Sequence, residues 1–337
     1  MAPDHEQEQW RPSADMAVLR LRAILLYRIR QFFYERHVLE VDTPILSHAG
    51  NPDVHIESFR TFYDGPGGSH NLYLQTSPEF AMKRLLASGS GPVYQICKAF
   101  RDEELSRIHN PEFTMLEWYR PGFDHHQLMD EVQAFLVHLD LLAPDESVQK
   151  FTYQQLFQHF ADIDPHTATR EECAACVRLH AIQMGAGRSV PSEASIEYSK
   201  DMLLDVILTH IIEPELRKLS FIFVYDYPQN QASLAKIRHG NPSVAERFEL
   251  FGKGLELANG FNELTDNEEQ LQRFTQDQAV RKERGQQDIN IDQYLIDSIR
   301  NGLPECAGVA IGFDRLLMLA CGKQSLEEVL CFPFGRA

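Results

Sequence analysis

The chain has 337 residues, 43% of them apolar, and its 49 acidic side chains outnumber 32 basic ones to give a net charge of −17. It contains no run of about 18 apolar residues, and its polar N-terminus lacks the apolar stretch of a signal peptide, so we expect a cytoplasmic protein without a membrane span. Proteins that bind nucleic acids contact the phosphates with basic side chains. Because this chain has a net charge of −17, we expect no stable nucleic-acid binding. The acidic balance favours a cationic substrate or a basic protein partner.

The first 142 residues alternate between helical and extended patterns. Between residues 13 and 37 the spacing predicts an amphipathic helix capped by Ser13, with the apolar stripe Leu21, Leu25, Ile29, Phe32 and Phe33. The elements expected after it are strands at 38–41 and 71–76, a helix with Ser77 as cap and Pro78 at its first position, strands at 93–96 and 111–119, and a helix at 124–142.

Residues 143–200 are loosely patterned and are interpreted as an insertion, in which Cys173 and Cys176 are expected to be buried or inert thiols. The elements expected after it are strands at 219–225, 247–257 and 308–313, helices at about 266–284, 291–301 and 314–321, and a last short helix with Ser325 and Glu328 at capping-box spacing. Strands with helices set between them predict an α+β fold, with one large antiparallel sheet flanked by helices.

Three segments carry the chemistry, and in chain order they are Val41-Asp42-Thr43-Pro44-Ile45-Leu46, then Phe100-Arg101-Asp102-Glu103 with His109-Asn110-Pro111-Glu112-Phe113, then Gly308-Val309-Ala310-Ile311-Gly312-Phe313-Asp314-Arg315. These segments resemble motifs 1, 2 and 3 of class II aminoacyl-tRNA synthetases. The resemblance covers residues 13–337 as a single catalytic domain and implies that the protein uses ATP. Motif 1 in that family also implies a homodimer, and the apolar stripe on residues 16–33 is expected to suit such an isologous contact.

The physical chemistry of these segments agrees with an ATP site. Arg101 ends an apolar strand, where a fixed guanidinium can hold a phosphate and a carboxylate. Arg315 lies in the first turn of a helix, where backbone donors already favour phosphate. Alternation along 111–119 places Phe113 on the same face as Glu117 and Tyr119, about 13 Å away at ~3.3 Å per residue. Such a face can stack adenine at one end and bind an amino acid at the other.

Further segments resemble the active site of lysyl-tRNA synthetases: Thr76-Ser77-Pro78-Glu79, Thr114–Tyr119 and Glu256–Leu264. The resemblance implies that Glu79 and Glu117 face the amino group nearest the reacting carboxyl, that Glu263 and Tyr119 hold the distal ammonium, that Asn259 and Arg101 hold the carboxylate, and that Glu256 ligates Mg²⁺. It also implies that the amino acid is bound by Ser77, Pro78 and Ala310. The residues that it implies for binding ATP are Arg101, Asp102, Glu103, His109, Asn110, Phe113, Glu256, Leu257, Gly312 and Arg315. A desolvated dication such as lysine needs several carboxylates around it.

One detail conflicts with simple alternation, which puts Glu256 on the opposite face from Asn259 and Glu263. We therefore expect the strand to bulge or end near Gly260.

Lysyl-tRNA synthetases carry an anticodon-binding OB-fold before motif 1, and we expect none here because only about a dozen residues precede the first helix. Three segments look like a truncated subgroup of that family: Gln231–Ala235, Tyr119-Arg120-Pro121 and Cys306–Ala310. Members of this subgroup attach (R)-β-lysine to a lysine side chain of elongation factor P. The resemblance therefore implies an AMP-forming ligase that modifies a translation factor, with (R)-β-lysine or lysine as substrate.

Three alternatives are open at this point. A stand-alone enzyme could charge tRNA with lysine. An amidating ligase of the asparagine synthetase kind needs a cationic pocket, which the acidic cluster disfavours. A non-catalytic paralogue predicts loss of an ATP-binding side chain, yet Arg101 and Arg315 are both present.

Overall fold

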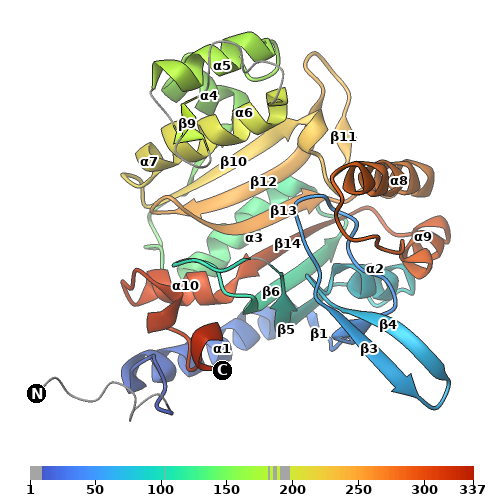
Figure 1. The fold of residues 1–337 in the computed structure, drawn as a ribbon. Helices are drawn as coiled ribbons and strands as arrows, with labels where there is room; N and C mark the ends of the chain where they lie inside the picture. The colour runs from blue at the N-terminus through green and yellow to red at the C-terminus, as the bar shows by residue number, and fades with distance from the viewer. Residues whose placement is uncertain (1–9, 103, 181–182, 185–187, 190–197) are drawn as a thin grey trace, which may run out of the picture. The chain divides into compact units, whose positions relative to one another are not determined.

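The computed structural model describes residues 10–102, 104–180, 183–184, 188–189 and 198–337. The chain divides into two compact units, one made of Met1–Pro144 with Thr265–Ala337 and the other of Asp145–Leu264. Both units contain β-strands packed with helices, so the predicted α+β class is confirmed (Figure 1). Among the described helices, none is both long and apolar enough to cross a bilayer.

Four strands of the first unit lie in the order β1, β5, β6, β14, with the bounds Leu39–Glu40, Val93–Phe100, Glu112–Pro121 and Cys306–Gly312. β6 is antiparallel to both of its neighbours, whereas β1 is parallel to β5, so this sheet is mixed and not purely antiparallel as predicted. The register places Gln95 and Ala310 directly opposite Glu117 from the two sides. Residues opposite each other on neighbouring strands share a face of the sheet, so these three side chains lie next to one another.

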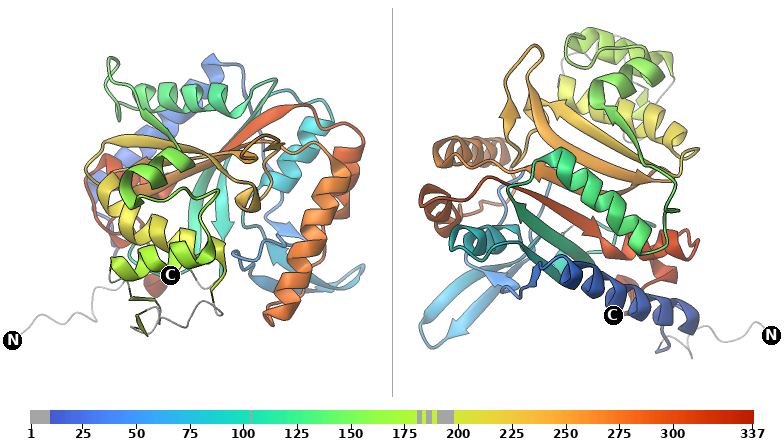
Figure 2. Two further views of the ribbon diagram at one scale, coloured as in Figure 1. Left: turned by 90° about the horizontal axis from the view of Figure 1, so that it is seen from above. Right: turned by 180° about the vertical axis from the view of Figure 1, so that it is seen from behind.

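The helices of this unit are α1 (Met16–Glu35), α2 (Glu79–Ala87), α3 (His125–His138), α8 (Asn267–Glu283), α9 (Gln293–Arg300) and α10 (Phe313–Ala320), with 3-10 turns at Leu326–Glu328 and Phe334–Arg336. A separate small sheet has the order β2 (Leu46–Ser47), β4 (Gly68–Leu74), β3 (Arg60–Gly65). Seen from behind, α1 and α3 lie over one face of β5, β6 and β14 (Figure 2). The other face is thereby left for the polar side chains of β6.

An aromatic cluster joins α1 to this sheet. The Phe33 ring stacks on Tyr94 with 4.2 Å between ring centroids and meets Trp118 edge-on at 5.3 Å. Phe32 packs edge-on against Phe135 of α3 at 5.3 Å. All five rings are buried, and each buried aromatic removes a large apolar area from water. The cluster therefore fixes α1 and α3 against the back of β5 and β6.

The predicted first helix is confirmed, but Asp15 rather than Ser13 caps it, because the Asp15 carboxylate accepts from the Val18 N–H at 2.9 Å. Most of its apolar stripe is buried inside the chain and is not available to a partner. A second set of side chains stays exposed on the same helix: Ile24, Tyr27 and Tyr34.

The second unit has strands in the order β13, β12, β10, β7, with the bounds Leu255–Asn262, Val244–Gly252, Phe221–Pro228 and Gln149–Thr152, and β11 (Ile237–Arg238) pairs with β12. Its helices are α4 (Tyr153–Ala161), α5 (Arg170–Leu179), α6 (Lys200–Ile207) and α7 (Glu213–Leu216), with a π-helical turn at Leu208–Ile212, a 3-10 turn at Gln229–Gln231, and short strands β8 (Gln183–Met184) and β9 (Arg188–Ser189). Cys173 and Cys176 are buried and unpaired, as predicted, and pack in the core between helices and strands.

The strand predicted at 247–257 is wrong, because β12 and β13 form an antiparallel hairpin. Lys253 and Gly254 form its turn, and both have positive φ, which glycine adopts without strain. The expected irregularity exists at a different place. Leu250 pairs with Ala258 but Phe251 pairs with Glu256, so the bulge is at Leu257 and not near Gly260, and β13 continues to Asn262.

Two smaller boundaries also differ from prediction. The strand expected at 93–96 runs on to Phe100, which carries it directly to Arg101. Helix α2 begins at Glu79, with Pro78 at the cap position, so Pro78 is not its first helical residue. The Ser77 hydroxyl still accepts from the first helical N–H, that of Glu79, at 3.0 Å.

Candidate functional site

A buried carboxylate, Glu117, is the centre of the first polar cluster. The Ser77 hydroxyl donates to one of its oxygens at 2.7 Å, and the Tyr119 hydroxyl donates to the other at 2.7 Å. Glu79 in the first turn of α2 accepts from the Lys83 ammonium at 2.5 Å. Strand alternation aims Glu117 and Tyr119 at one face, and the start of α2 brings Ser77 and Glu79 to it. The structure thus assembles four of the residues predicted to bind the amino acid.

The surroundings of Glu117 bring the pKa of its carboxylate close to neutral pH. Burial raises the pKa of Glu117 to about 7, and the neighbouring Glu79 carboxylate adds to the rise. Hydrogen bonds from Ser77 and Tyr119 and the charge of Lys83 oppose it. A cationic ligand next to Glu117 would stabilise its ionised form, because the positive charge offsets the repulsion between the Glu117 and Glu79 carboxylates.

A cavity of about 480 Å³ opens beside this cluster. Its wall includes Ser77, Pro78 and Glu79, residues 46–51 from the end of motif 1 onward, and residues 290–294 at the start of α9. The lining mixes apolar and polar side chains, which is typical of small-molecule sites. Ser77, Pro78 and Glu79, which are predicted to bind the amino acid, are therefore accessible from this cavity.

Arg101 and Phe113 form the second cluster. The Arg101 guanidinium lies over the Phe113 ring at 5.2 Å, and one of its nitrogens is 3.7 Å from the Glu104 carboxylate. Its Nε is buried and has no hydrogen-bond partner among the described residues. The Arg101 backbone N–H donates to Pro111 O at 2.9 Å, which fixes the start of the loop. A buried donor of this sort is suited to an anionic ligand.

The other predicted residues of motif 2 differ in their roles. The Asn110 amide donates to Glu112 O at 2.6 Å and accepts from the Phe334 N–H at 3.0 Å, so it holds the loop against the C-terminal turn. The His109 ring contacts the Ser106 hydroxyl at 2.8 Å. Asp102 is half-buried at the loop entrance, and Glu103 lies outside the described residues.

Motif 3 places small residues opposite the first cluster. Ala310 faces Glu117 and Gly312 faces Met115 across the β14–β6 pair. The Arg315 Nε donates to Ile108 O at 3.2 Å, so the first turn of α10 is tied to the motif 2 loop. A carbon at the Cβ position of Gly312 would lie 3.7 Å from the Arg315 side chain, which is an ordinary van der Waals contact.

In the second unit, β13 presents the remaining predicted residues. The bulge at Leu257 puts Glu256 on the same face as Asn259, because their partners Phe251 and Glu249 lie two residues apart on β12. The Arg247 Nε donates to Asn259 Oδ1 at 3.2 Å, so Oδ1 is the end of the Asn259 amide that faces Arg247. Glu263 follows β13, is only 1% exposed and forms an antiparallel bridge with Ala235.

Comparisons with known proteins agree with this arrangement. Residues 7–336 match the family described as tRNA synthetases class II (D, K and N). This chain belongs to that family. An elongation factor P–(R)-β-lysine ligase of Vibrio cholerae is 48% identical over 330 residues, covering 97% of this chain and 98% of the relative. A ligase of the same name from Salmonella gallinarum is 48% identical over 334 residues, covering 98% and 99%.

The family uses ATP, and Glu256 is the residue predicted to hold Mg²⁺. Within the described ranges no cluster of three or more His, Cys, Asp or Glu side chains could hold a metal alone. Glu249 is a diagonal neighbour of Glu256, and burial together with the Glu256 charge raises the pKa of Glu249. Mg²⁺ commonly binds through one or two carboxylates plus substrate phosphates. These residues therefore fit an ion that arrives with the nucleotide.

Three residues of this class II site were not predicted from the sequence. Lys83 pairs with Glu79, and the i, i+4 spacing of the two residues could have revealed it. Arg247 orients Asn259 across a strand pair, which no local pattern shows. Asp314 accepts from Arg22 at 2.6 Å and from the Thr114 N–H at 2.6 Å, which connects motif 3 to α1 and to motif 2.

Proposed function

We propose that this enzyme uses ATP to activate (R)-β-lysine, or lysine, and transfers it to a lysine side chain of elongation factor P. The observation that carries the proposal is the buried Glu117 cluster, with the Glu79 carboxylate beside it and Ser77 and Tyr119 on its two oxygens. Several carboxylates in a desolvated site select a ligand with two ammonium groups. Relatives that match nearly the whole chain are named as ligases of elongation factor P and (R)-β-lysine, which supports this acceptor.

In the first step, a carboxylate oxygen of the amino acid attacks the α-phosphorus of ATP. The bond to the pyrophosphate oxygen breaks, giving an aminoacyl-adenylate and pyrophosphate. We propose that Arg101 and Arg315 stabilise the negative charge on the transferring phosphate. Arg101 and the side-chain amide of Asn259 would bind the amino-acid carboxylate. Positioning and charge stabilisation carry this step, and no general base is required.

The other assigned residues bind the nucleotide. We propose that adenine stacks on Phe113, with Asp102, Glu103, His109, Asn110, Leu257 and Gly312 lining the rest of the ATP site. Mg²⁺ bound at Glu256 would supply positive charge to the phosphates. Glu256, with Glu249 beside it, would hold that ion in place.

In the second step, a deprotonated lysine amine of the acceptor attacks the adenylate carbonyl. An amide forms, the bond to the phosphate oxygen breaks, and AMP leaves. A net charge of −17 disfavours tRNA as the acceptor and suits a basic protein surface. With a translation factor as acceptor, we propose that the enzyme acts in the cytoplasm.

Pyrophosphate exchange with α-lysine and with (R)-β-lysine, followed by the intact mass of elongation factor P, tests the proposal. We expect exchange with (R)-β-lysine and a mass gain on elongation factor P of one lysyl group. Acylation of tRNA without modification of elongation factor P would instead identify a stand-alone tRNA-charging enzyme. Exchange with neither isomer would indicate a non-catalytic paralogue.

We further propose a homodimer. The exposed apolar side chains Ile24, Tyr27 and Tyr34 recur on α1 at helical spacing, and they suit an isologous contact better than the buried stripe does. Light scattering at micromolar concentration is expected to give twice the chain mass. A matched pair of variants, Tyr27→Glu on this surface and Leu179→Glu on exposed α5, should give a monomer and a dimer respectively. A monomeric wild type would refute the dimer.

The pKa of Glu117 predicts a pH-dependent affinity for the amino acid. The folded-state pKa of about 7 lies above the ordinary value of 4.5, so the fold favours the protonated form, and this contribution to stability is lost as pH rises through 7. Binding an ammonium favours the ionised form instead. We therefore expect KM for the lysine substrate to rise about tenfold from pH 8 to pH 6, since the ionised fraction falls about tenfold.

Glu117→Gln removes the titrating group and should give a high KM that no longer varies across this pH range. The KM for ATP serves as the control and should change little in the wild type. A flat profile for the lysine KM of the wild type would show that Glu117 is ionised throughout, or that it lies away from the substrate.

A further inference from the structure

The segment 51–57 is ordered without belonging to a helix or a strand. The Asn51 side chain accepts from the Asp53 N–H at 3.0 Å, and the Asp53 side chain accepts from the His55 N–H at 2.8 Å, so two local turns shape it. Its carbonyls have no strand to pair with along most of its length. Within the segment, only the Ile56 N–H donates to one of them, Asp53 O, at 3.4 Å, so donors from other parts of the chain are needed for buried carbonyls.

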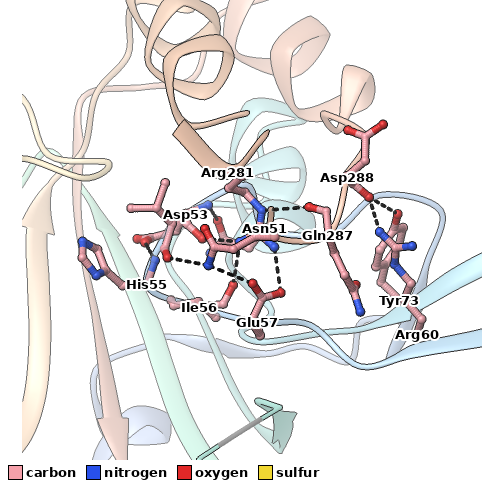
Figure 3. A network of polar contacts seen from close by, with 12 residues as sticks. Asn51, Asp53, His55, Ile56, Glu57, Arg60, Tyr73, Arg281, Gln287 and Asp288 are labelled. Atoms are coloured by element: carbon pink, nitrogen blue, oxygen red, sulfur yellow. Dashed lines mark hydrogen bonds and ion pairs between the residues drawn. The ribbon is translucent and has the colours of Figure 1, made fainter. Parts of the chain in front are cut away.

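Arg281, on α8, fills that role. It is 1% exposed, and its guanidinium donates to Asp53 O at 2.9 Å, Ile56 O at 3.3 Å and Gln287 O at 3.1 Å. Its remaining nitrogen donates to the Glu57 carboxylate at 2.7 Å (Figure 3). A planar fork with five donors can serve four acceptors at once, which a lysine ammonium cannot do. Glu57 supplies the opposite charge that makes the burial tolerable.

Gln286 adds a second set of contacts to the same segment. Its amide donates to Val54 O at 3.1 Å and to the second Glu57 oxygen at 2.9 Å. Both oxygens of Glu57 are thus held from the end of α8. The backbone of Glu57 has little freedom as a result.

The same backbone reaches motif 2. Glu57 O accepts from the Asp102 N–H at 2.9 Å in an antiparallel bridge. The preceding two residues are fixed in the same way, because Arg101 donates to Pro111 O and Phe100 donates to Gln75 O, each at 2.9 Å. Backbone hydrogen bonds from three consecutive residues, Phe100, Arg101 and Asp102, therefore define the turn that presents the Arg101 side chain. The last of these hydrogen bonds is accepted by Glu57.

We propose that Arg281 and Glu57 are positioning residues that hold the motif 2 loop so that Arg101 meets ATP in the productive orientation. This inference rests on the proposed activation step and assigns it two residues outside the three class II motifs. The alternative is that Arg281 only stabilises the fold. The two ideas differ in how strongly each substrate is affected. The amino acid keeps the Glu117 cluster, which β6 and α2 hold, so a loosened Glu57 should weaken ATP use much more than lysine binding.

Steady-state pyrophosphate exchange with Gln286→Ala, Glu57→Gln and Arg281→Lys tests this, with KM measured separately for ATP and for (R)-β-lysine. We expect the KM for ATP to rise in that order, reaching about tenfold for Arg281→Lys, while the lysine KM, to which Arg101 contributes only through the carboxylate, rises by a smaller factor. A small misplacement of a phosphate-binding group is enough for such a loss. Parallel changes in both KM values, or none, would overturn the proposal.

Glu131→Gln is the matched control. Glu131 is a buried carboxylate that accepts from the Trp118 indole at 3.0 Å and lies 3.5 Å from the Arg120 guanidinium, so its loss lowers stability away from segment 51–57. It should shift the urea midpoint without raising the KM for ATP. If Arg281→Lys does not fold, Gln286→Ala and Glu57→Gln carry the same comparison.

Direct titration of ATP by calorimetry separates this inference from the proposed function. If the wild type exchanges with no lysine isomer, the proposed activity fails, but weaker ATP binding by Arg281→Lys than by wild type would still support the positioning role. Equal ATP affinities of the two proteins would reject it.

Discussion

Replacing Glu263 by glutamine is expected to raise the barrier to amino-acid activation by ~3–5 kcal/mol, which lowers kcat/KM about 10²- to 5 × 10³-fold, with ATP affinity nearly unchanged. The side chain is 1% exposed, so a ligand ammonium that meets it cannot be hydrated there. With the carboxylate neutralised, the distal ammonium of the substrate keeps no counter-charge, and such an uncompensated charge is costly. Pyrophosphate exchange over a range of (R)-β-lysine concentrations measures the loss.

Glu246→Gln is the control for this substitution. Glu246 is a partly buried carboxylate on the neighbouring β12, and it accepts from Arg238 and from the Asn262 amide at 3.1 and 2.6 Å. Its neutralisation should leave exchange within about twofold of wild type, as expected for a surface pair. An unchanged exchange rate in Glu263→Gln would place that residue outside the pocket.

Periodicity predicted most elements of this fold because one face of each is buried. The stripe Leu25, Ile29, Phe32, Phe33 on α1 is buried as its spacing indicates. The hairpin β12–β13 was missed because apolar residues run through both strands and the turn is only Lys253-Gly254. A tight turn between two strands of similar composition interrupts the hydrophobic pattern for two residues only.

The candidate site was predicted less evenly. Alternation was sufficient for Glu117 and Tyr119, whose hydrogen bond lies within one strand. The position of the Leu257 bulge was not predictable, since it depends on how β13 pairs with β12. Arg281 was not predicted either: it lies in a polar helix, and two of its partners are carbonyl groups more than 220 residues away in the chain. Every residue carries a backbone carbonyl, so the sequence does not indicate which carbonyls accept hydrogen bonds from Arg281.

The structure also bears on Ala310, which was predicted to line the amino-acid site. Ala310 lies directly opposite Glu117 and shares its face of the sheet. Its neighbours Val309 and Ile311 point to the other face and are buried, as alternation requires. The Ala310 methyl group is thus next to the carboxylate assigned to the amino group nearest the reacting carboxyl. Moving that amino group from carbon 2 to carbon 3 changes the required space by about one methylene.

We therefore expect Ala310→Gly to raise the use of α-lysine by about 10- to 100-fold relative to (R)-β-lysine, the range in which one methylene discriminates. Paired kcat/KM values for the two isomers measure this ratio. Ala307→Gly, on the same strand but buried on the opposite face, controls for the general cost of glycine in a strand and should leave the ratio unchanged. If Ala310→Gly lowered both isomers equally, Ala310 would only pack the strand, and selectivity would have to come from Glu117 and its partners Ser77 and Tyr119.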